Sequence, residues 1–146
     1  MSRAQLAEKS LDTEALFERY HVGWKTRNPD LIASLHSEDT IFWVHDGAGP
    51  INGREPLRQY SAELFARAPF GFEEGRMFFG ADYWVMEWSM VMDLIDKAGK
   101  PFTAKVETLD VVTVNPAGEV TRKDVYVNGT QRVDALNRAG LSASRN

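Results

Sequence analysis

Hydrophobic residues in the first part of the chain recur three or four positions apart, which is the spacing of helices. This spacing predicts a helix that begins at Asp12 or Thr13, either of which can cap it, and runs to Arg27. The Asn-Pro-Asp sequence at 28–30 ends that helix and begins a second one, which stops near Ser37. The reason is that the residue before a proline avoids the helical region, while asparagine caps and proline suits a first turn.

A short strand, a loop and a third helix are predicted next. Thr40–His45 is rich in β-branched and aromatic residues, and Asp46–Gly53 is rich in turn-forming residues. Helical spacing returns over 54–68, where Pro69 ends it. The chain therefore carries three helices before its longest strands.

After Pro69 the spacing of the apolar residues changes to every second position, which is the period of a β-strand. In the clearest segment the large residues Trp84, Met86, Trp88 and Met90 share one face, and we expect this face in the core. Strands are predicted over Phe72–Phe79, Tyr83–Ile95, Phe102–Val114 and Glu119–Val127. A short helix is predicted after them, over 131–138.

Helices first and long antiparallel strands after them predict an α+β fold. We expect a curved, mostly antiparallel sheet that wraps around the three N-terminal helices and encloses an apolar pocket. The 146 residues fit a single domain, with a core over about 12–138 and flexible residues at 1–11 and 139–146.

Asp110 is the residue that points most directly to a pocket. On the strand Phe102–Val114, the row of side chains that contains Asp110 is apolar apart from Thr108. A carboxylate among apolar groups is costly unless it is paired, hydrogen-bonded or protonated. Asp110 is therefore a candidate functional residue.

The charge and composition exclude several classes of function. A net charge of −4 and a pI near 5.4 leave no basic surface for nucleic acid. The chain has no cysteine, which excludes disulfides and thiolate chemistry and fits a cytoplasmic protein. No stretch is long and apolar enough for a membrane span, so we expect no membrane partner. The three histidines lack metal-ligand spacing, and we predict neither a metal nor another cofactor.

The order of these elements resembles the nuclear-transport-factor-2-like superfamily, in its SnoaL-like and ketosteroid-isomerase-like branch. The residues that carry the resemblance are four segments in order, at 18–20 (ERY), 24–30, 51–55 (INGRE) and 110–120 (DVVTVNPAGEV). The resemblance implies a cone-shaped, cystatin-like α+β roll around a small-molecule pocket.

Comparison with ketosteroid isomerases implies roles for two residues. Tyr20 falls at the position of their oxyanion-binding tyrosine, and Asp110 at that of their protonated aspartic acid. A bracing hydrogen bond between the same two side chains is the structural alternative. Val44 falls where their general-base aspartate stands, so the usual base is replaced.

His45 and Asp46 lie beside this replaced base and are the candidates to take over its role. Alternation puts His45 on the face opposite Val44, which favours a rim or surface histidine instead. We expect His21 and His36 to be a solvent-facing and a helix-end residue.

Limonene epoxide hydrolases give a weaker match. Their catalytic Arg and two Asp residues correspond here to Thr108, Asp110 and Asn128. Two of the three groups are thus replaced, and we do not expect epoxide hydrolysis.

Large apolar side chains on the helices and on the inner strand faces are predicted to line the pocket. The candidate ligand-binding residues are Trp24, Phe42, Val44, Tyr60, Phe65, Met86, Trp88, Met90, Val106, Thr108, Val125 and Val127. On the last strand the resemblance places Lys123 on the pocket face as well, and Arg122 and Asp124 on the outer face. The outer face also carries Tyr83, Val85, Val91, Leu109 and Val111, which predicts a homodimer through the sheet.

Two hypotheses follow from the sequence. The first is a cofactor-free isomerase, cyclase or dehydratase that acts on a small apolar carbonyl compound, with Tyr20 and Asp110 polarising its oxygen and His45 or Asp46 as base. The second is a non-catalytic ligand-binding or dimerisation module of the same fold, which the replacement by Val44 favours.

Overall fold

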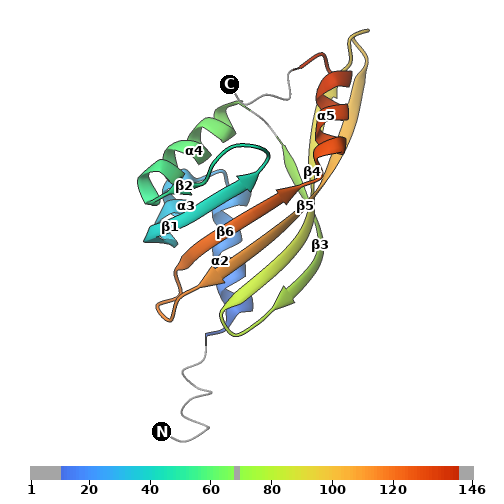
Figure 1. The fold of residues 1–146 in the computed structure, drawn as a ribbon. Coiled ribbons are helices and arrows are strands. Elements are labelled where there is room, and N and C mark those ends of the chain that lie inside the picture. The colour runs from blue at the N-terminus through green and yellow to red at the C-terminus, as the bar shows by residue number, and fades with distance from the viewer. Residues whose placement is uncertain (1–10, 68–69, 142–146) are drawn as a thin grey trace, which may run out of the picture.

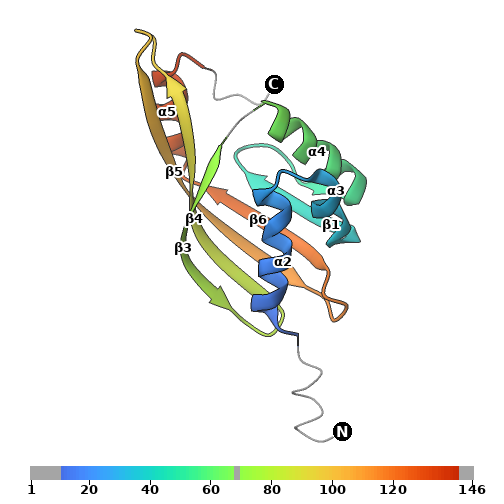
Figure 2. The ribbon, with the colours of Figure 1, turned by 180° about the vertical axis from the view of Figure 1, so that it is seen from behind.

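A curved six-stranded sheet carries helices against one of its faces (Figures 1 and 2). The structure is a computed structural model that describes residues 11–67 and 70–141. The strand order is β2-β1-β6-β5-β4-β3, with β1 and β6 parallel and all other neighbours antiparallel. The predicted α+β fold is confirmed. Most of 1–11, all of 142–146 and Pro69 lie outside the described residues.

Helix α2 (Thr13–Lys25) crosses the concave face of the sheet, as Figure 2 shows. Asp12 is its cap, because the Asp12 carboxylate accepts a hydrogen bond from the backbone N–H of Ala15 at 3.1 Å. Asn28 caps α3 (Pro29–Ser34) in the same way through the N–H of Leu31 at 3.1 Å. The predicted break between the two helices is confirmed.

Strand β1 (His36–His45) begins four residues earlier than predicted, since the pattern placed its start at Thr40. The second helix therefore ends before Ser37. Long-range contacts explain the difference: the N–H of Val120 donates to the carbonyl of Leu35 at 2.9 Å, and His36 pairs with Val120 in β6. The loop expected over 46–53 contains the two-residue strand β2 (Ile51–Asn52).

The remaining elements lie close to their predicted bounds. Helix α4 (Arg54–Arg67) packs against α3 and β1. It is followed by strands β3 (Gly71–Phe79), β4 (Tyr83–Ile95), β5 (Pro101–Val114) and β6 (Val120–Val127), and by helix α5 (Gly129–Arg138). Helix α5 lies against the far ends of β4 and β5 (Figure 1).

The core lies between the concave face of the sheet and helix α2. Alternate residues of β5 are buried, among them Val106, Thr108, Asp110 and Val112, as the two-residue period predicts. In β4 the buried face begins at Trp84, which packs against α2. No helix of the described residues has the length and apolar character that crossing a membrane requires.

Candidate functional site

A small cavity of about 80 Å³ lies between helices α2 and α4 and the concave face of the sheet. Its volume corresponds to about three molecules of liquid water, well below the ~300–1,000 Å³ of a drug-sized site. The wall is mostly aromatic and aliphatic. The residues around it are His21, Trp24, Phe42, Val44, Tyr60, Leu64, Phe70, Phe72, Trp88, Met90, Asp110, Lys123, Val125 and Val127.

Asp110 is buried in this wall and has two donors. It is 5% exposed, and one carboxylate oxygen accepts the indole N–H of Trp88 at 2.9 Å. The other oxygen lies 3.3 Å from Nζ of Lys123. Antiparallel pairing of β4, β5 and β6 places these three side chains on one face. A carboxylate has about four lone-pair positions, so with two donors Asp110 can still accept hydrogen bonds from a ligand.

Lys123 is the buried cation of the site. It is 6% exposed, and its Nζ lies 4.4 Å from the ring centroid of Trp24, 5.1 Å from that of Tyr20 and 5.8 Å from that of Phe42. Burial, the largest single effect, lowers the pKa of Lys123, but attraction to Asp110 and Tyr20 together with hydrogen bonds to both outweighs it, and the pKa is raised overall. Lys123 therefore stays charged at neutral pH, in contact with the Asp110 carboxyl group.

Tyr20 is hydrogen-bonded to His36 rather than to Asp110. The Tyr20 hydroxyl lies 2.9 Å from Nε2 of His36, and Nδ1 of His36 lies 2.7 Å from the hydroxyl of Thr40. The Thr40 hydroxyl in turn donates to the carbonyl of Val120 at 3.3 Å. These bonds form one chain from α2 through β1 to β6.

The direction of this chain follows from its last member. A carbonyl only accepts, so the Thr40 hydroxyl donates to it and accepts from the Nδ1–H of His36. Burial, reinforced by the charges of Lys123 and Arg54, lowers the pKa of His36 to about 3, so the ring is neutral and Nε2 carries no proton. Tyr20 therefore donates its proton to His36, and its oxygen is left as an acceptor.

This chain gives Tyr20 a different environment from the one expected. Burial raises the pKa of the Tyr20 phenol, and the charge of Lys123 opposes that rise only in part. The ring of Tyr20 and the carboxylate of Asp110 thus contact the same Lys123 ammonium group, but no hydrogen bond joins Tyr20 to Asp110 in the described structure.

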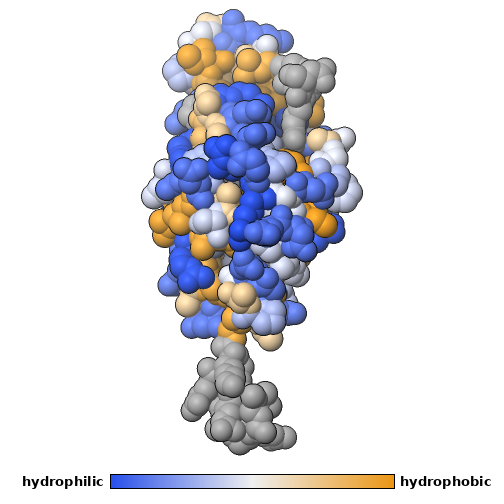
Figure 3. Space-filling view, turned by 90° about the vertical axis from the view of Figure 1, so that its left-hand side faces the viewer, coloured by the Kyte–Doolittle hydropathy of each residue, from blue (hydrophilic) through white to orange (hydrophobic). Residues whose placement is uncertain are grey.

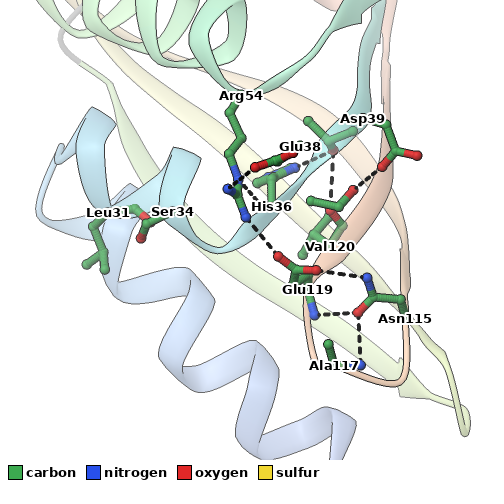
Figure 4. A network of polar contacts seen from close by, with 12 residues as sticks. Leu31, Ser34, His36, Glu38, Asp39, Arg54, Asn115, Ala117, Glu119 and Val120 are labelled. Carbon is green, nitrogen blue, oxygen red and sulfur yellow. Dashed lines mark hydrogen bonds and ion pairs between the residues drawn. The ribbon is translucent and has the colours of Figure 1, made fainter.

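A second polar network fixes the end of the site at which His36 lies (Figure 4). Arg54, at the start of α4, donates to the carbonyl of His36 at 2.6 Å and to the carboxylate of Glu119 at 2.8 Å. Glu119 also accepts the side-chain amide of Asn115 at 3.1 Å. Arg54, Asn115 and Glu119 therefore hold the β5–β6 turn against α4 and β1.

Comparison with known proteins identifies the family. The SnoaL-like domain family matches residues 17–123, which is most of the chain. The chain belongs to the SnoaL-like domain family. None of the curated proteins compared with the chain matches it.

Solved structures similar to this SnoaL-like domain share its fold at low identity. A protein of ketosteroid isomerase-like fold from Catenulispora acidiphila, in complex with trimethylamine, is 19% identical at a TM-score of 0.69 over 88% of this chain and 94% of that chain. A protein assigned as a SnoaL-like polyketide cyclase from Shewanella denitrificans is 13% identical at a TM-score of 0.72, over 85% of this chain and 96% of that chain. An LEH-like epoxide hydrolase from M. tuberculosis is 14% identical at a TM-score of 0.68, over 86% of this chain and 89% of that chain.

His45 and Asp46 of the SnoaL-like domain lie outside the cavity, so the structure does not bring them together with Asp110, and their role as a base stays a prediction. Nε2 of His45 bonds the outer-face carboxylate of Asp124 at 2.8 Å, and its ring stacks on Tyr126 at 4.3 Å. Hydrogen bonding from Arg122 lowers the pKa of Asp124. The physical reason is alternation along β1, which turns His45 away from the cavity. Asp46 accepts the N–H of Ala48 in the loop that follows.

Eight of the twelve predicted pocket residues line the cavity: Trp24, Phe42, Val44, Tyr60, Trp88, Met90, Val125 and Val127. The other four do not. Met86, Val106 and Thr108 are buried on the concave face of the sheet outside the cavity. Phe65 instead packs edge-on against Trp24 at 5.8 Å. Their roles as ligand contacts stay predictions.

Besides Leu64, Phe70 and Phe72 in the cavity wall, the structure adds three titratable residues to the predicted site: Lys123, His21 and His36. The family resemblance places Lys123 on the pocket face, but it gives no sign of the ion pair with Asp110. We expect His21 to face solvent and His36 to lie at a helix end, yet they are 5% and 0% exposed and His36 begins strand β1. Their aromatic neighbours come from distant strands, as in the contact of His21 with Phe72 at 5.3 Å, and only the folded chain brings them together.

No group of three or more His, Cys, Asp or Glu side chains among the described residues is arranged to hold a metal ion.

Proposed function

We propose that the protein is an isomerase, cyclase or dehydratase that acts on a small apolar carbonyl compound without a cofactor. The observation that carries the proposal is the buried pair of Asp110 and Lys123 in the wall of an otherwise apolar cavity. Buried titratable groups of opposite charge beside a cavity are frequent at catalytic sites. The SnoaL-like fold, which suggests small-molecule binding, supports the same class of function.

The proposed step is proton transfer next to the carbonyl group. The α C–H bond of the substrate breaks, and its proton moves to a carboxylate oxygen of Asp110. The electron pair moves to the carbonyl oxygen, which becomes the enolate oxygen and pairs with the Lys123 ammonium. Return of the proton to another carbon is isomerisation, attack of the enolate on a second carbonyl is cyclisation, and loss of a β-hydroxyl group is dehydration.

The charge of the site supports this assignment of roles. Before the step, the cavity wall holds one anion and one cation in contact. After it, Asp110 is neutral and the anion is the enolate, so Lys123 still faces a single negative charge. No net charge is created in a low-dielectric site, where isolated charge is most costly.

Tyr20 and Trp88 then have positioning roles. In this proposal Tyr20, which is not among the residues around the cavity, acts by presenting its ring and oxygen to Lys123, since its proton is donated to His36. Trp88 fixes one oxygen of Asp110 and leaves the remaining lone pairs for the substrate proton.

The test is uptake of deuterium from D2O into the α position of pentan-2-one, followed by proton NMR. We expect the protein to accelerate exchange and Asp110→Asn to lower the rate at least ~100-fold, because a positioned base contributes roughly 10²–10⁴-fold.

Asp124→Asn is the matched control, since it removes a carboxylate from the outer face of β6, and we expect it to exchange at the wild-type rate. A wild-type protein that leaves exchange at the rate of buffer, or an Asp110→Asn variant that keeps full activity, contradicts the proposal.

A non-catalytic ligand-binding module is the second candidate. Asp110 has Lys123 on one oxygen and the Trp88 N–H on the other, so both of its oxygens already have a donor without a substrate. Binding of pentan-2-one without exchange supports this candidate.

We also propose a homodimer through the outer sheet face. Tyr83 and Tyr126 are 42% and 46% exposed there. Figure 3 shows a different side of the molecule, on which hydrophilic residues predominate between scattered hydrophobic ones. A measured molecular mass in solution tests the dimer, and the expected cytoplasmic location stays a prediction.

A further inference from the structure

Thr40 and His36 lie behind the cavity wall. Both side chains are 0% exposed, and neither is among the residues around the cavity. They stand on strand β1, where His36 pairs with Val120 of β6 (Figure 4). Hydrogen bonds nevertheless join them to Tyr20, whose ring and oxygen face the Lys123 ammonium group of the site. They can therefore influence the site without contacting a ligand.

The Thr40 hydroxyl sets the direction of these hydrogen bonds. Its oxygen lies 3.3 Å from the carbonyl oxygen of Val120 and 3.4 Å from that of Thr121, and a carbonyl only accepts. The single hydroxyl proton is used there, so the Thr40 oxygen accepts the Nδ1–H of His36 at 2.7 Å. This acceptor holds the proton of the neutral ring on Nδ1, and Nε2 accepts the Tyr20 proton at 2.9 Å.

The Tyr20 oxygen is consequently an acceptor toward its other neighbours. Burial raises the pKa of the Tyr20 phenol, and the charge of Lys123 together with hydrogen bonds from Trp24 and Lys123 opposes that rise. A hydroxyl has one proton and two lone pairs, so Tyr20 has no second proton to give to a ligand. Its oxygen instead accepts from Lys123, whose Nζ also lies 3.3 Å from the Asp110 carboxylate.

We propose that Thr40 and His36 are positioning residues, which fix the Lys123 ammonium group so that its third N–H faces a carbonyl oxygen in the cavity. An ammonium group has three N–H donors, and within the described part of the chain Tyr20 and Asp110 take two of them. Two fixed acceptors prevent the group from rotating. The inference rests on the proposed function, because it takes Lys123 as the group that binds the carbonyl oxygen.

Thr40→Val is the variant that should reverse the direction of the hydrogen bonds. It keeps the shape of the side chain but removes the acceptor of the Nδ1–H. The ring proton of His36 then moves to Nε2, where the Tyr20 oxygen accepts it. The Tyr20 proton has to turn away from His36 and toward Lys123, which is itself only a donor. The ammonium group therefore loses one of the two acceptors that fix it.

The test combines nitrogen NMR of the His36 ring with deuterium exchange into pentan-2-one. We expect the ring proton on Nδ1 in the wild-type protein and in Thr40→Ser, which keeps the hydroxyl, but on Nε2 in Thr40→Val. Exchange should fall roughly 10- to 100-fold in Thr40→Val, since a small misplacement of a group that holds the substrate has an effect of this size. Thr40→Ser should exchange close to the wild-type rate.

Two controls separate this role from an effect on stability, and circular dichroism first shows that each protein is folded. Ser61→Ala removes another buried hydroxyl, which donates to the carbonyl of Leu57 within α4, and it should exchange at the wild-type rate. Tyr20→Phe removes the oxygen through which Thr40 acts, so Thr40→Val should cause no further loss of exchange in that background. A purely structural effect of Thr40→Val would multiply with that of Tyr20→Phe.

A wild-type His36 ring with its proton on Nε2 overturns the inference, and this measurement needs no variant. Exchange in Thr40→Val that is as fast as in Thr40→Ser also overturns it. Failure of the proposed function is distinct, because the wild-type protein then leaves exchange at the rate of buffer. In that case the nitrogen resonance of the Lys123 ammonium group decides the inference. It should shift in Thr40→Val and not in Thr40→Ser, and an unchanged resonance in Thr40→Val overturns the inference.

Discussion

At the scale of single residues, His36 decides how Tyr20 is used. Its neutral ring accepts the Tyr20 proton on one side and donates to Thr40 on the other. Protonation of His36 would give Nε2 a proton and remove its capacity to accept from Tyr20. The bond from α2 to β1 therefore depends on an uncharged imidazole.

Stability should fall in acid for this reason. The pKa of His36 is lowered from 6.5 to about 3, so between these values the unfolded chain binds a proton that the folded chain does not. Stability is then present above pH 6.5 and is lost as the pH falls toward 3. For His36 alone, the free energy of unfolding should drop by about 2–3 kcal/mol from pH 7 to pH 4.5.

Urea denaturation of the wild-type protein and His36→Gln at both pH values measures this drop. The variant should be less stable at pH 7 but should lose less stability on acidification. An equal drop in both proteins would show that His36 does not carry this pH dependence. His21, whose pKa is lowered to about 4, contributes in the same direction and stays in both proteins.

The partner of Lys123 is the residue-scale feature that the sequence could not supply. The family resemblance implies that Lys123 lies on the pocket face of β6, and alternation predicts that Asp110 lies on the apolar face of β5. Contact between them depends on the register of the two strands, in which Asp110 lies opposite Val125. No local pattern encodes that register. The sequence therefore indicates Asp110 as a functional residue but does not indicate its ion pair with Lys123.

At the scale of elements, a bulge in β3 bends the sheet beside the cavity. The pairing of β3 with β4 shifts between Glu74 and Met77. Gly75 lies in this bulge, where an added Cβ would come within 2.8 Å of the carbonyl oxygen of Glu87. The close approach of the two strands therefore requires glycine, and it places Glu74 near His21.

Gly75→Ala should destabilise the fold by about 1–3 kcal/mol, because the β4 backbone has to move. Gly71→Ala is the matched control on the same strand, where an added Cβ meets Val91 at 4.0 Å, an ordinary contact. We expect Gly71→Ala to change stability by less than about 0.5 kcal/mol. Thermal melts of the two variants check this, and equal melting temperatures would contradict the role given to Gly75.

Most element bounds could be predicted because their signals are local. The caps Asp12 and Asn28 and the alternation in β4 and β5 are examples. The start of β1 could not, since residues 36–39 become a strand through contacts with β6 that are far away in sequence.

At the scale of the whole molecule, residues that carried the family resemblance turn out to be structural. Arg54, Asn115 and Glu119 belong to the segments that resemble the superfamily, and they hold α4, β1 and the β5–β6 turn together (Figure 4). The resemblance therefore predicts the cone, whereas the chemistry depends on the residues inside it. At that level the ion pair of Lys123 with Asp110 and the burial of His21 are the features that the resemblance did not predict.

The central claim is that Asp110 and Lys123 act as one unit on a bound carbonyl compound. The most direct measurement is the rate of deuterium exchange into pentan-2-one for the wild-type protein, Asp110→Asn, Lys123→Met and the double variant, each first shown to be folded by circular dichroism. We predict that each single variant loses at least ~100-fold and that the double variant is no slower than the slower single variant. Wild-type exchange in Lys123→Met, or losses that multiply in the double variant, would contradict it.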